Sequence, residues 1–525
     1  MKRNFLLLLF AVVTFVSQAT QTRFFVRETG VDNYETTGTE SDPFKTINYA
    51  LTKCALTGDT IDVLGVILTA DSLGTVNTPI AINNGKGVTI IGHGTENTFI
   101  QPASTKGESN NRVFTFADAD KIVIKDLTIR WGNVVSLPNQ TGANINSWQT
   151  EFELDNVVVT GGTAKTGGGI HIQGTNNKFV VIRNSVISDN TAELYGGGIS
   201  TGGTGSQGSK LEIHKSLIAY NKLTSTASAR GGGLYFDSYQ SQSCEYAIYN
   251  STIAFNETPT ANAAFGSSFN TTAPVRVTMW NNTIAYNEAH AQTDITNVTG
   301  AGAYYPAKTP NFTFDLLNNL FMENIGKAWG KTPDFYDVSL NGPTLERVSY
   351  NIFTNNMPDY YIHKPYNSQP DSDPGKTNIY NGNTLVKLAT ELANNGGPTQ
   401  TLAIATGSSA INAGQFNPLP FMSTDQRGFS RDLSTDIGAF EFIDFTSTAK
   451  ALFNKNDVFY DFSTNQIIAK NDGFNLEVYN LTGVCVLKKE LTGNSINVSE
   501  LSPGQIYIAV VKWSDLGITT FKFKR

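Results

Sequence analysis

An internal repeat constrains the fold of this chain more than any other feature. A seven-residue motif occurs eight times between residues 126 and 356, and successive copies begin 28 to 37 residues apart. The clearest copies are NSVISDN at 184–190, KSLIAYN at 215–221, NSTIAFN at 250–256 and NNTIAYN at 281–287. A unit of this size cannot bury an apolar face by itself, so neighbouring units must stack on one another to form a solenoid.

Two positions of the motif keep their character from copy to copy. The fourth is apolar and rich in strand-favouring types: Ile129, Val159, Ile187, Ile218, Ile253, Ile284, Phe321 and Phe353. The seventh is Asn in six copies: Asn190, Asn221, Asn256, Asn287, Asn324 and Asn356. We expect the apolar column inside the solenoid. We expect the carboxamides to form a hydrogen-bonded ladder at a bend, where Asn tolerates a left-handed backbone.

Glycine clusters separate several of the repeats, at 167–169, 196–198 and 231–233. Glycine lets two backbones approach closely, so these clusters predict corners of the coils. Short strands without helices between them indicate an all-β fold. The sequence therefore predicts a right-handed, single-stranded parallel β-helix over residues 20–442.

The open N-terminal end of such a solenoid needs a cover. A helix at about residues 43–56 is predicted to supply it, with Asp42 as the N-cap and Pro43 at the first helical position. The side chains on the face of this helix toward the first coil would be Phe44, Ile47, Leu51 and Cys54.

The pattern changes after residue 442. Residues 443–450 are small and polar and are interpreted as a linker. In residues 451–525, six short alternating segments are separated by turn residues, which is typical of a small Ig-like β-sandwich.

The N-terminus and the composition indicate the compartment. Residues 1–19 combine a basic start, an apolar run and small residues at the end, which is typical of a secretory signal peptide. The net charge of −7 gives no reason to expect a nucleic-acid partner. The three cysteines are odd in number and far apart, which favours buried thiols over a disulfide framework. We expect an exported monomer.

Several segments resemble known bacterial surface proteins. Residues 25–47 are similar to the N-terminal segment of pectate-lyase-like β-helix proteins, and the repeats with their Gly-Gly-Gly-Ile corners resemble those of polymorphic outer-membrane adhesins. Residues 395–441, with NGGPTQTL, DQRG and DIGAFE, resemble the closing segment of choice-of-anchor-type surface proteins.

The tail carries a further resemblance. VYNLTG from Val478, LSPG from Leu501 and the basic end after Phe521 are similar to the type A sorting domain of the type IX secretion system of Bacteroidetes. This resemblance implies export by that machinery, followed by release or attachment at the outer surface of the outer membrane.

The candidate ligand site is an aromatic column at the sixth motif position, formed by Tyr220, Phe255 and Tyr286. Such a column is interpreted either as a platform for sugar rings or as a shield for the bend beneath it. No cofactor is identified from the sequence. A Ca²⁺ or glycan site is an option at Asp425, Arg427, Asp436 and Glu441, whose other interpretation is ion pairs and turn caps.

An enzyme of this fold would need carboxylates at matched positions of neighbouring coils, and none is predicted within the clear repeats. The expected function is therefore a non-catalytic adhesin or glycan-binding protein. The alternatives are a polysaccharide lyase or glycoside hydrolase of the same fold, and a purely structural surface-layer component.

Overall fold

The computed structural model divides into two compact units, Met1–Phe442 and Ile443–Arg525. The structure describes residues 21–54, 57–69, 78–175, 178–202, 208–227, 229–239, 243–260, 262–270, 273–290, 311–327, 334–335, 344–354, 378–379, 382–417, 419, 422–431, 433–443, 458–461, 465–469, 474–480, 485–490, 495–513 and 517–525. The predicted signal peptide and almost all of the predicted linker lie outside these residues.

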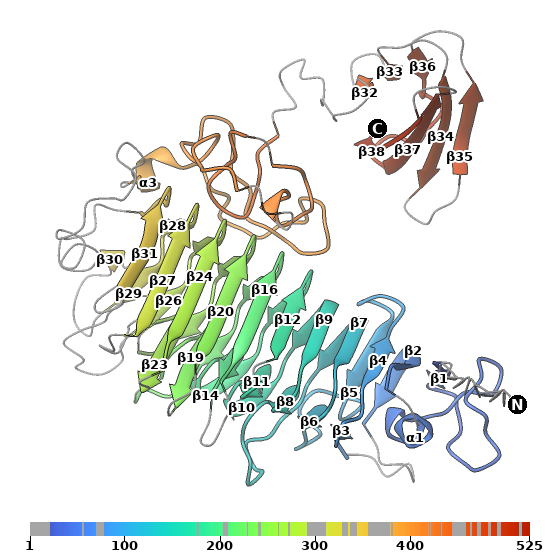
Figure 1. Cartoon of the computed structure of the whole chain (residues 1–525), viewed down its shortest axis with the longest axis vertical. Coiled ribbons are helices and arrows are strands. Elements are labelled where there is room, and N and C mark those ends of the chain that lie inside the picture. Colours follow the sequence, from blue (N-terminus) through green and yellow to red (C-terminus); the bar gives the residue numbers. More distant parts are fainter. Residues whose placement is uncertain are drawn as a thin grey trace, which may run out of the picture. The chain divides into compact units, whose positions relative to one another are not determined.

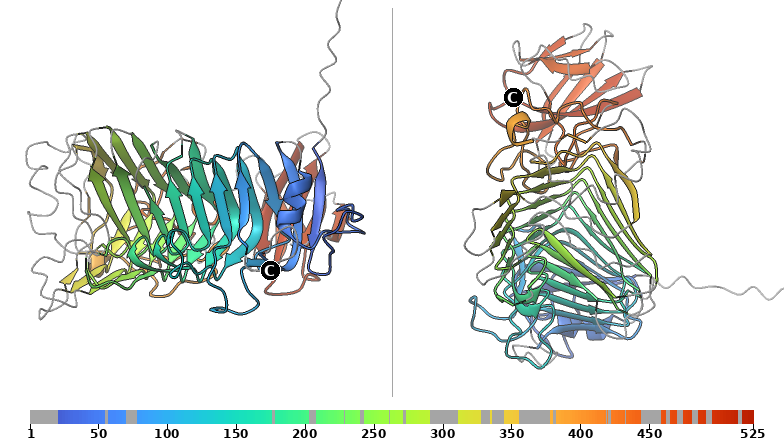
Figure 2. Two further views of the ribbon diagram at one scale, coloured as in Figure 1. Left: turned by 90° about the horizontal axis from the view of Figure 1, so that it is seen from below. Right: turned by 90° about the vertical axis from the view of Figure 1, so that its left-hand side faces the viewer.

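The first unit is a parallel β-solenoid, as the repeat predicts (Figure 1). Its coils stack along one axis, and their strands form three sheets that run along the sides of the solenoid (Figure 2). The largest sheet contains β1 (Arg23–Arg27), β2 (Asp59–Leu68), β4 (Val88–Ile91), β5 (Thr98–Gln101), β7 (Ile122–Arg130), β9 (Phe152–Thr160), β12 (Phe179–Arg183), β13 (Val186–Ser188), β16 (Lys210–His214), β17 (Leu217–Ala219), β20 (Cys244–Tyr249), β21 (Thr252–Ala254), β24 (Val275–Trp280), β25 (Thr283–Ala285), β27 (Phe312–Leu317), β28 (Leu320–Met322) and β31 (Thr344–Ser349).

Two smaller sheets complete the coils. One contains β3 (Ile80–Asn83), β6 (Phe114–Ala117), β8 (Ile145–Trp148), β11 (Ile170–Gln173), β15 (Ile199–Thr201), β19 (Leu234–Tyr239) and β23 (Phe265–Asn270). The other contains β10 (Thr163–Thr166), β14 (Thr191–Tyr195), β18 (Lys222–Leu223), β22 (Glu257–Thr258), β26 (Glu288–His290), β29 (Ile325–Lys327) and β30 (Asp334–Phe335).

The apolar column stacks inside the solenoid, as predicted. Ile187 pairs with Ile218, Ile218 with Ile253 and Ile253 with Ile284, each as a parallel register partner on the next coil. All eight members of the column are fully buried. Its last two rings, Phe321 and Phe353, stack with centroids 5.3 Å apart. One position per coil therefore supplies a continuous row of the core.

The glycine clusters form corners where neighbouring coils touch through their backbones. Gly169 donates to the carbonyl of Gly197 on the next coil at 3.1 Å. A Cβ on Gly197 would lie 2.4 Å from the carbonyl oxygen of Gly232, closer than any side chain tolerates. The clusters are needed for this close approach, as the sequence indicated.

The N-terminal helix is shorter than predicted. It is α1 (Ile47–Lys53), and its N-cap is Thr46, whose hydroxyl accepts from the backbone N–H of Tyr49. The predicted capping role of Asp42 is wrong, because its carboxylate accepts from the N–H and hydroxyl of Thr37 in the preceding loop. The four apolar residues predicted to face the first coil are all buried in the core of the solenoid.

The second unit contains two antiparallel sheets, consistent with a small β-sandwich. One is formed by β32 (Val458–Asp461), β33 (Gln466–Ala469) and β36 (Ser495–Asn497), and the other by β35 (Cys485–Glu490), β34 (Phe474–Asn480), β37 (Ile506–Trp513) and β38 (Gly517–Lys524). Six of these strands fall on predicted segments, whereas β33 was not predicted. Cys54 and Cys244 are buried as expected, but Cys485 is exposed on an edge strand, so its predicted burial is wrong.

Within the described residues, no helix is long and apolar enough to cross a membrane.

Because the core residues are stacked, we expect a cavity among them to lower the stability of the first unit strongly. Replacing Ile253 by Ala should lower the free energy of unfolding of the first unit by about 2–5 kcal/mol, because the pocket between Ile218 and Ile284 cannot close. Urea unfolding followed by circular dichroism would measure this. The same change at Val135, which is 46% exposed, should shift the midpoint little; an equal loss at both positions would contradict the role of the column.

Candidate functional site

The asparagine column is a continuous buried ladder. The carboxamide Nδ2 of each residue donates to Oδ1 of the next, at 3.0 Å from Asn190 to Asn221, 3.0 Å from Asn221 to Asn256, 2.9 Å from Asn256 to Asn287 and 2.8 Å from Asn287 to Asn324. All five side chains are fully buried. The sixth predicted member, Asn356, lies outside the described residues.

Each carboxamide of the ladder ties three coils together. For Asn256, Oδ1 accepts from both the backbone N–H and the Nδ2 of Asn221 on the preceding coil. Its own Nδ2 donates to the carbonyl of Ile218 and to Asn287. Because these groups are buried, the ladder is structural and offers nothing to a ligand.

The predicted left-handed conformation does not belong to the asparagines. It belongs to the residue before each of them, with φ of 51° to 58° at Asp189, Tyr220, Phe255, Tyr286 and Glu323. A second left-handed position, with φ of 46° to 56°, is the first residue of every motif copy. Two such bends turn the chain sharply on either side of a three-residue strand.

A second ladder was missed in the sequence. It runs through the second motif position, where Nδ2 of Asn282 donates to Asn319 at 3.0 Å, Asn319 to Asn351 at 2.9 Å and Asn351 to Asn378 at 3.1 Å. In earlier coils serine takes this place, and the hydroxyl of Ser251 accepts from the backbone N–H of Ser216. The signal was present, because this position is Ser or Asn in six successive copies.

The aromatic column forms an offset stack on the outside of the bend. Tyr220 and Phe255 have centroids 5.2 Å apart and planes 11° apart, and Phe255 and Tyr286 have values of 5.2 Å and 14°. Each ring projects from a left-handed residue, a conformation that costs roughly 1–2 kcal/mol. Stacking offsets part of this cost. We call these three rings the aromatic strip.

The rings of the strip differ in exposure. Phe255 and Tyr286 are partly buried and pack against an apolar cluster that includes Ala254, Leu402 and Phe440. Burial, followed by the charge of Glu323, raises the pKa of Tyr286 to about 12. Tyr220 ends the stack and is 47% exposed, so its ring is the one of the three that is most accessible to a ligand.

Carboxylates border the exposed end of the strip. Asp189 occupies the same motif position as Tyr220 on the preceding coil and is exposed. In the sequence, Glu391 lies between Leu388 and Leu392. These two leucines pack against the same apolar cluster as Phe255, which brings this segment close to the strip. Burial, then the charges of Asp189 and Glu391, raises the pKa of the Tyr220 phenol. This end of the strip therefore combines a ring face with hydrogen-bond acceptors.

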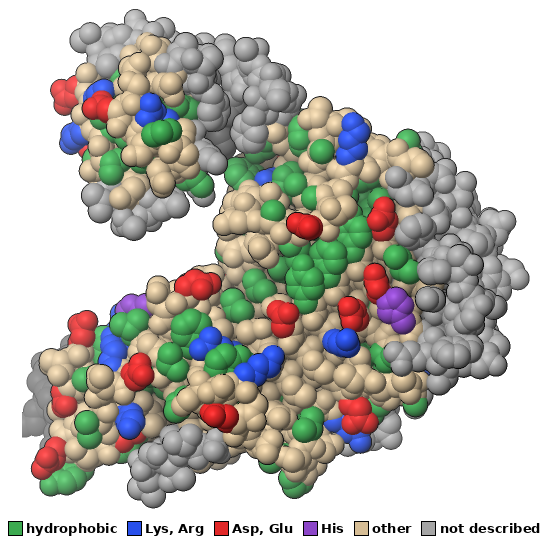
Figure 3. All heavy atoms as spheres, turned by 180° about the vertical axis from the view of Figure 1, so that it is seen from behind, with side chains coloured by type: hydrophobic (Ala, Val, Ile, Leu, Met, Phe, Trp, Pro, Cys, Tyr) green, Lys and Arg blue, Asp and Glu red, His purple; other side chains and the backbone are tan. Residues whose placement is uncertain are grey.

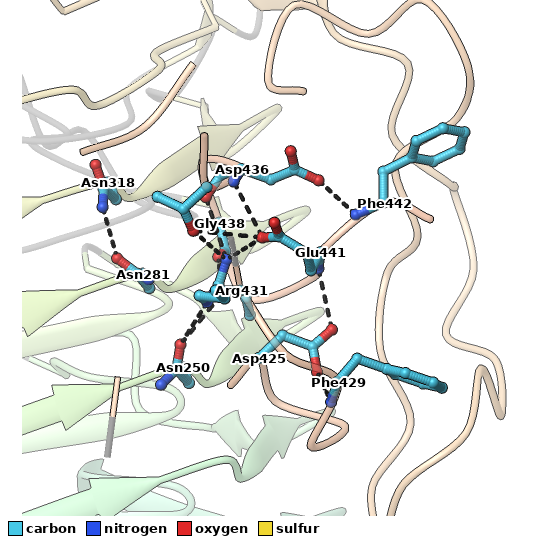
Figure 4. Close-up of polar contacts among 12 residues, drawn as sticks. Asn250, Asn281, Asn318, Asp425, Phe429, Arg431, Asp436, Gly438, Glu441 and Phe442 are labelled. Carbon is cyan, nitrogen blue, oxygen red and sulfur yellow. Dashed lines mark hydrogen bonds and ion pairs between the residues drawn. The ribbon is translucent and has the colours of Figure 1, made fainter. Parts of the chain in front are cut away.

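The closing segment does not simply cover the last coil. It runs back along the outside of the large sheet beside four coils, and its groups bond to Lys215, Asn250, Thr283 and Asn318. Figure 4 shows how three first-position asparagines face this segment. It thereby covers one flank of the aromatic strip.

Its charged residues are bonded within the chain itself. Arg431 is buried and binds Glu441 at 2.8 Å, Asn250 at 3.1 Å and the carbonyl of Gly438 at 2.7 Å (Figure 4). Asp425 accepts from the backbone of Phe429 and pairs with Arg427, while Asp436 accepts from the backbone of Asn412. These contacts fit ion pairs and turn caps rather than a calcium site.

Sequence reasoning missed a pair of carboxylates. Glu257 and Glu288 are register partners on β22 and β26, two residues after Phe255 and Tyr286. The prediction that no two carboxylates share a position in neighbouring coils is therefore wrong. Both are the eighth residue of a repeat, a position that the motif did not include.

Each of these glutamates has a basic partner. Glu257 pairs with Lys222 at 3.2 Å, and Glu288 lies 2.7 Å from Nε2 of His290. Across the part of the chain that the structure describes, no group of three or more His, Cys, Asp or Glu side chains is arranged to hold a metal ion.

Comparison of the chain with protein-family models and with curated proteins finds no match.

We expect the carboxamide nitrogen of each ladder asparagine to be essential for the stability of the first unit. Replacing Asn256 by Asp should destabilise the first unit more than replacing it by Ala, because a carboxylate would face the carbonyl of Ile218 and Oδ1 of Asn287 without a donor. Thermal unfolding of the two variants would measure the difference. Asn97, an exposed asparagine outside the ladder, provides the matched control. A milder effect of Asp than of Ala at position 256 would contradict the assigned bonding.

Proposed function

We propose that this chain is a secreted, surface-attached, non-catalytic protein that adheres to glycans through its aromatic strip. The observation that carries the proposal is the exposed ring of Tyr220 at the end of the stack, beside Asp189 and Glu391. Sugar rings place their apolar faces on aromatic side chains, and their hydroxyl groups donate to carboxylates nearby.

The solenoid suits this role because it is a rigid support. The coils that display Tyr220 and Phe255 are joined by the first asparagine ladder, through Asn221 and Asn256, and by bonds at the second motif position, through Ser216 and Ser251. The two rings therefore project from a backbone that is bonded to the next coil on both sides of the short strand. A rigid site loses little conformational entropy when a ligand binds. Figure 3 shows that hydrophobic side chains reach the surface on one face, with acidic side chains spaced around them.

Export and attachment belong to the same proposal. The N-terminal 19 residues would direct secretion, and the C-terminal β-sandwich would be the address read by the type IX secretion machinery. The protein would then remain in the medium or on the outer surface of the outer membrane, as a monomer. The resemblances of the tail and the repeats support this part.

A glycan-binding measurement tests the proposal. Replacing Tyr220 by Ala should weaken binding to glycans retained by the unmodified chain about tenfold, whereas Phe, which keeps the ring, should retain most of it. Glycan arrays would find the ligand and calorimetry would measure the affinity. Replacing Tyr34 by Ala removes an 87% exposed tyrosine elsewhere and serves as the control. Unchanged binding by a folded Tyr220→Ala variant would refute the proposal.

A second candidate function is hydrolysis or lyase cleavage of a polysaccharide. One observation favours it: Glu257 and Glu288 lie side by side in register on neighbouring coils beside the strip. Parallel strands lie about 4.8 Å apart, close to the ~5 Å between the two carboxyl groups of retaining glycosidases. The pairs with Lys222 and His290 draw the two carboxylates toward basic partners instead, so this function ranks second.

Activity measurements distinguish the two functions. The full chain should release no new reducing or unsaturated ends from neutral or acidic polysaccharides, with or without calcium, if it only binds. If ends do appear, replacing Glu257 or Glu288 by Gln should reduce their release at least a hundredfold. Release that depends on these glutamates would establish the hydrolase in place of the adhesin.

A further inference from the structure

The charges around the aromatic strip have one predominant sign. Five carboxylates border it: Asp189 and Glu323 at its two ends in the same motif position, Glu391 shortly before the closing segment, and Glu257 and Glu288 on the adjacent strands. The basic residues in these rows are Lys222, His290 and Lys327, the last of which is the register partner of His290. The border therefore favours positive charge on a ligand.

Two of the five carboxylates are already paired. Lys222 neutralises Glu257, and His290 lies against Glu288. Among the described residues, Asp189, Glu323 and Glu391 have no basic side chain within ion-pair distance. Two of these three, Asp189 and Glu391, lie at the end of the strip where Tyr220 is exposed.

An aromatic face with carboxylates at its border matches the requirements of an ammonium group. The ring attracts a cation through its quadrupole, and carboxylates accept strong charge-assisted hydrogen bonds from it. A polyuronate would bring negative charge against the same border and would be repelled. A neutral sugar would stack on Tyr220 and donate hydroxyl hydrogen bonds to the carboxylates, but it would lack the attraction between opposite charges.

We propose that the aromatic strip binds polysaccharides whose sugars carry free amino groups, such as glucosamine polymers. This inference rests on the proposed function, since it names the ligand class of the same strip. The ammonium group would lie between the ring of Tyr220 and the carboxylates of Asp189 and Glu391. Successive sugars would follow the strip along the solenoid axis, past Phe255 toward Glu323.

The test compares three oligosaccharides of equal length with the full chain: glucosamine, N-acetylglucosamine and galacturonate oligomers. Calorimetry at slightly acidic pH and low salt should show glucosamine oligomers binding at least fivefold more tightly than the acetylated ones, and galacturonate oligomers most weakly. Added salt should reduce this preference, because screening weakens the exposed charges. Equal or tighter binding of the acetylated or anionic oligomers would overturn the inference and leave the proposed function intact.

Variants separate the charge from the ring. The double change D189N and E391Q should abolish the preference for glucosamine, because it should weaken binding of the glucosamine oligomer much more than binding of the acetylated oligomer. Asn tolerates the left-handed backbone at position 189, so the bend should be kept. E108Q, which removes an exposed carboxylate of an earlier loop, is the matched control. A preference that survives the double change would refute the assigned carboxylates. Binding of none of the three oligomers would overturn the inference, whereas the proposed function is tested separately by the glycan array and the Tyr220→Ala variant.

Discussion

The structure depends on carboxamides that hydrogen-bond along the solenoid axis. In a solenoid each coil contacts only its neighbours, so the register between coils must be fixed locally. The fully buried Asn190–Asn324 ladder does this, since a coil shifted by one residue would leave buried donors and acceptors unpaired. Apolar residues such as Ile253 fill the interior but tolerate sliding far better, because hydrophobic contact has no direction.

The aromatic strip follows from the same register. Each ring projects from the residue before a ladder asparagine, at a left-handed bend that an aromatic side chain rarely adopts. The ladder holds the bends of successive coils one above another, and Tyr220, Phe255 and Tyr286 stack as a result. The aromatic strip therefore forms because the asparagine ladder beside it keeps successive coils in register.

Much of this arrangement could be predicted from the sequence, for a physical reason. Columns such as Ile218–Ile284 and Asn221–Asn287 occupy the same motif position in successive copies. Because the coils stack in register, residues at the same position lie in contact on neighbouring coils. Contacts that do not repeat could not be read in this way. The bonds from Arg431 to Asn250 join residues 181 positions apart, and the pairing of Glu257 with Glu288 uses a position that only two copies share.

The return path of the closing segment has a mechanical consequence. A simple solenoid under tension from its C-terminus would peel open one coil at a time. Here the chain before Phe442 is fastened to Asn250, Thr283 and Asn318, which lie on three successive coils. Tension arriving there would load these attachments together, in shear, before the terminal coil could unzip.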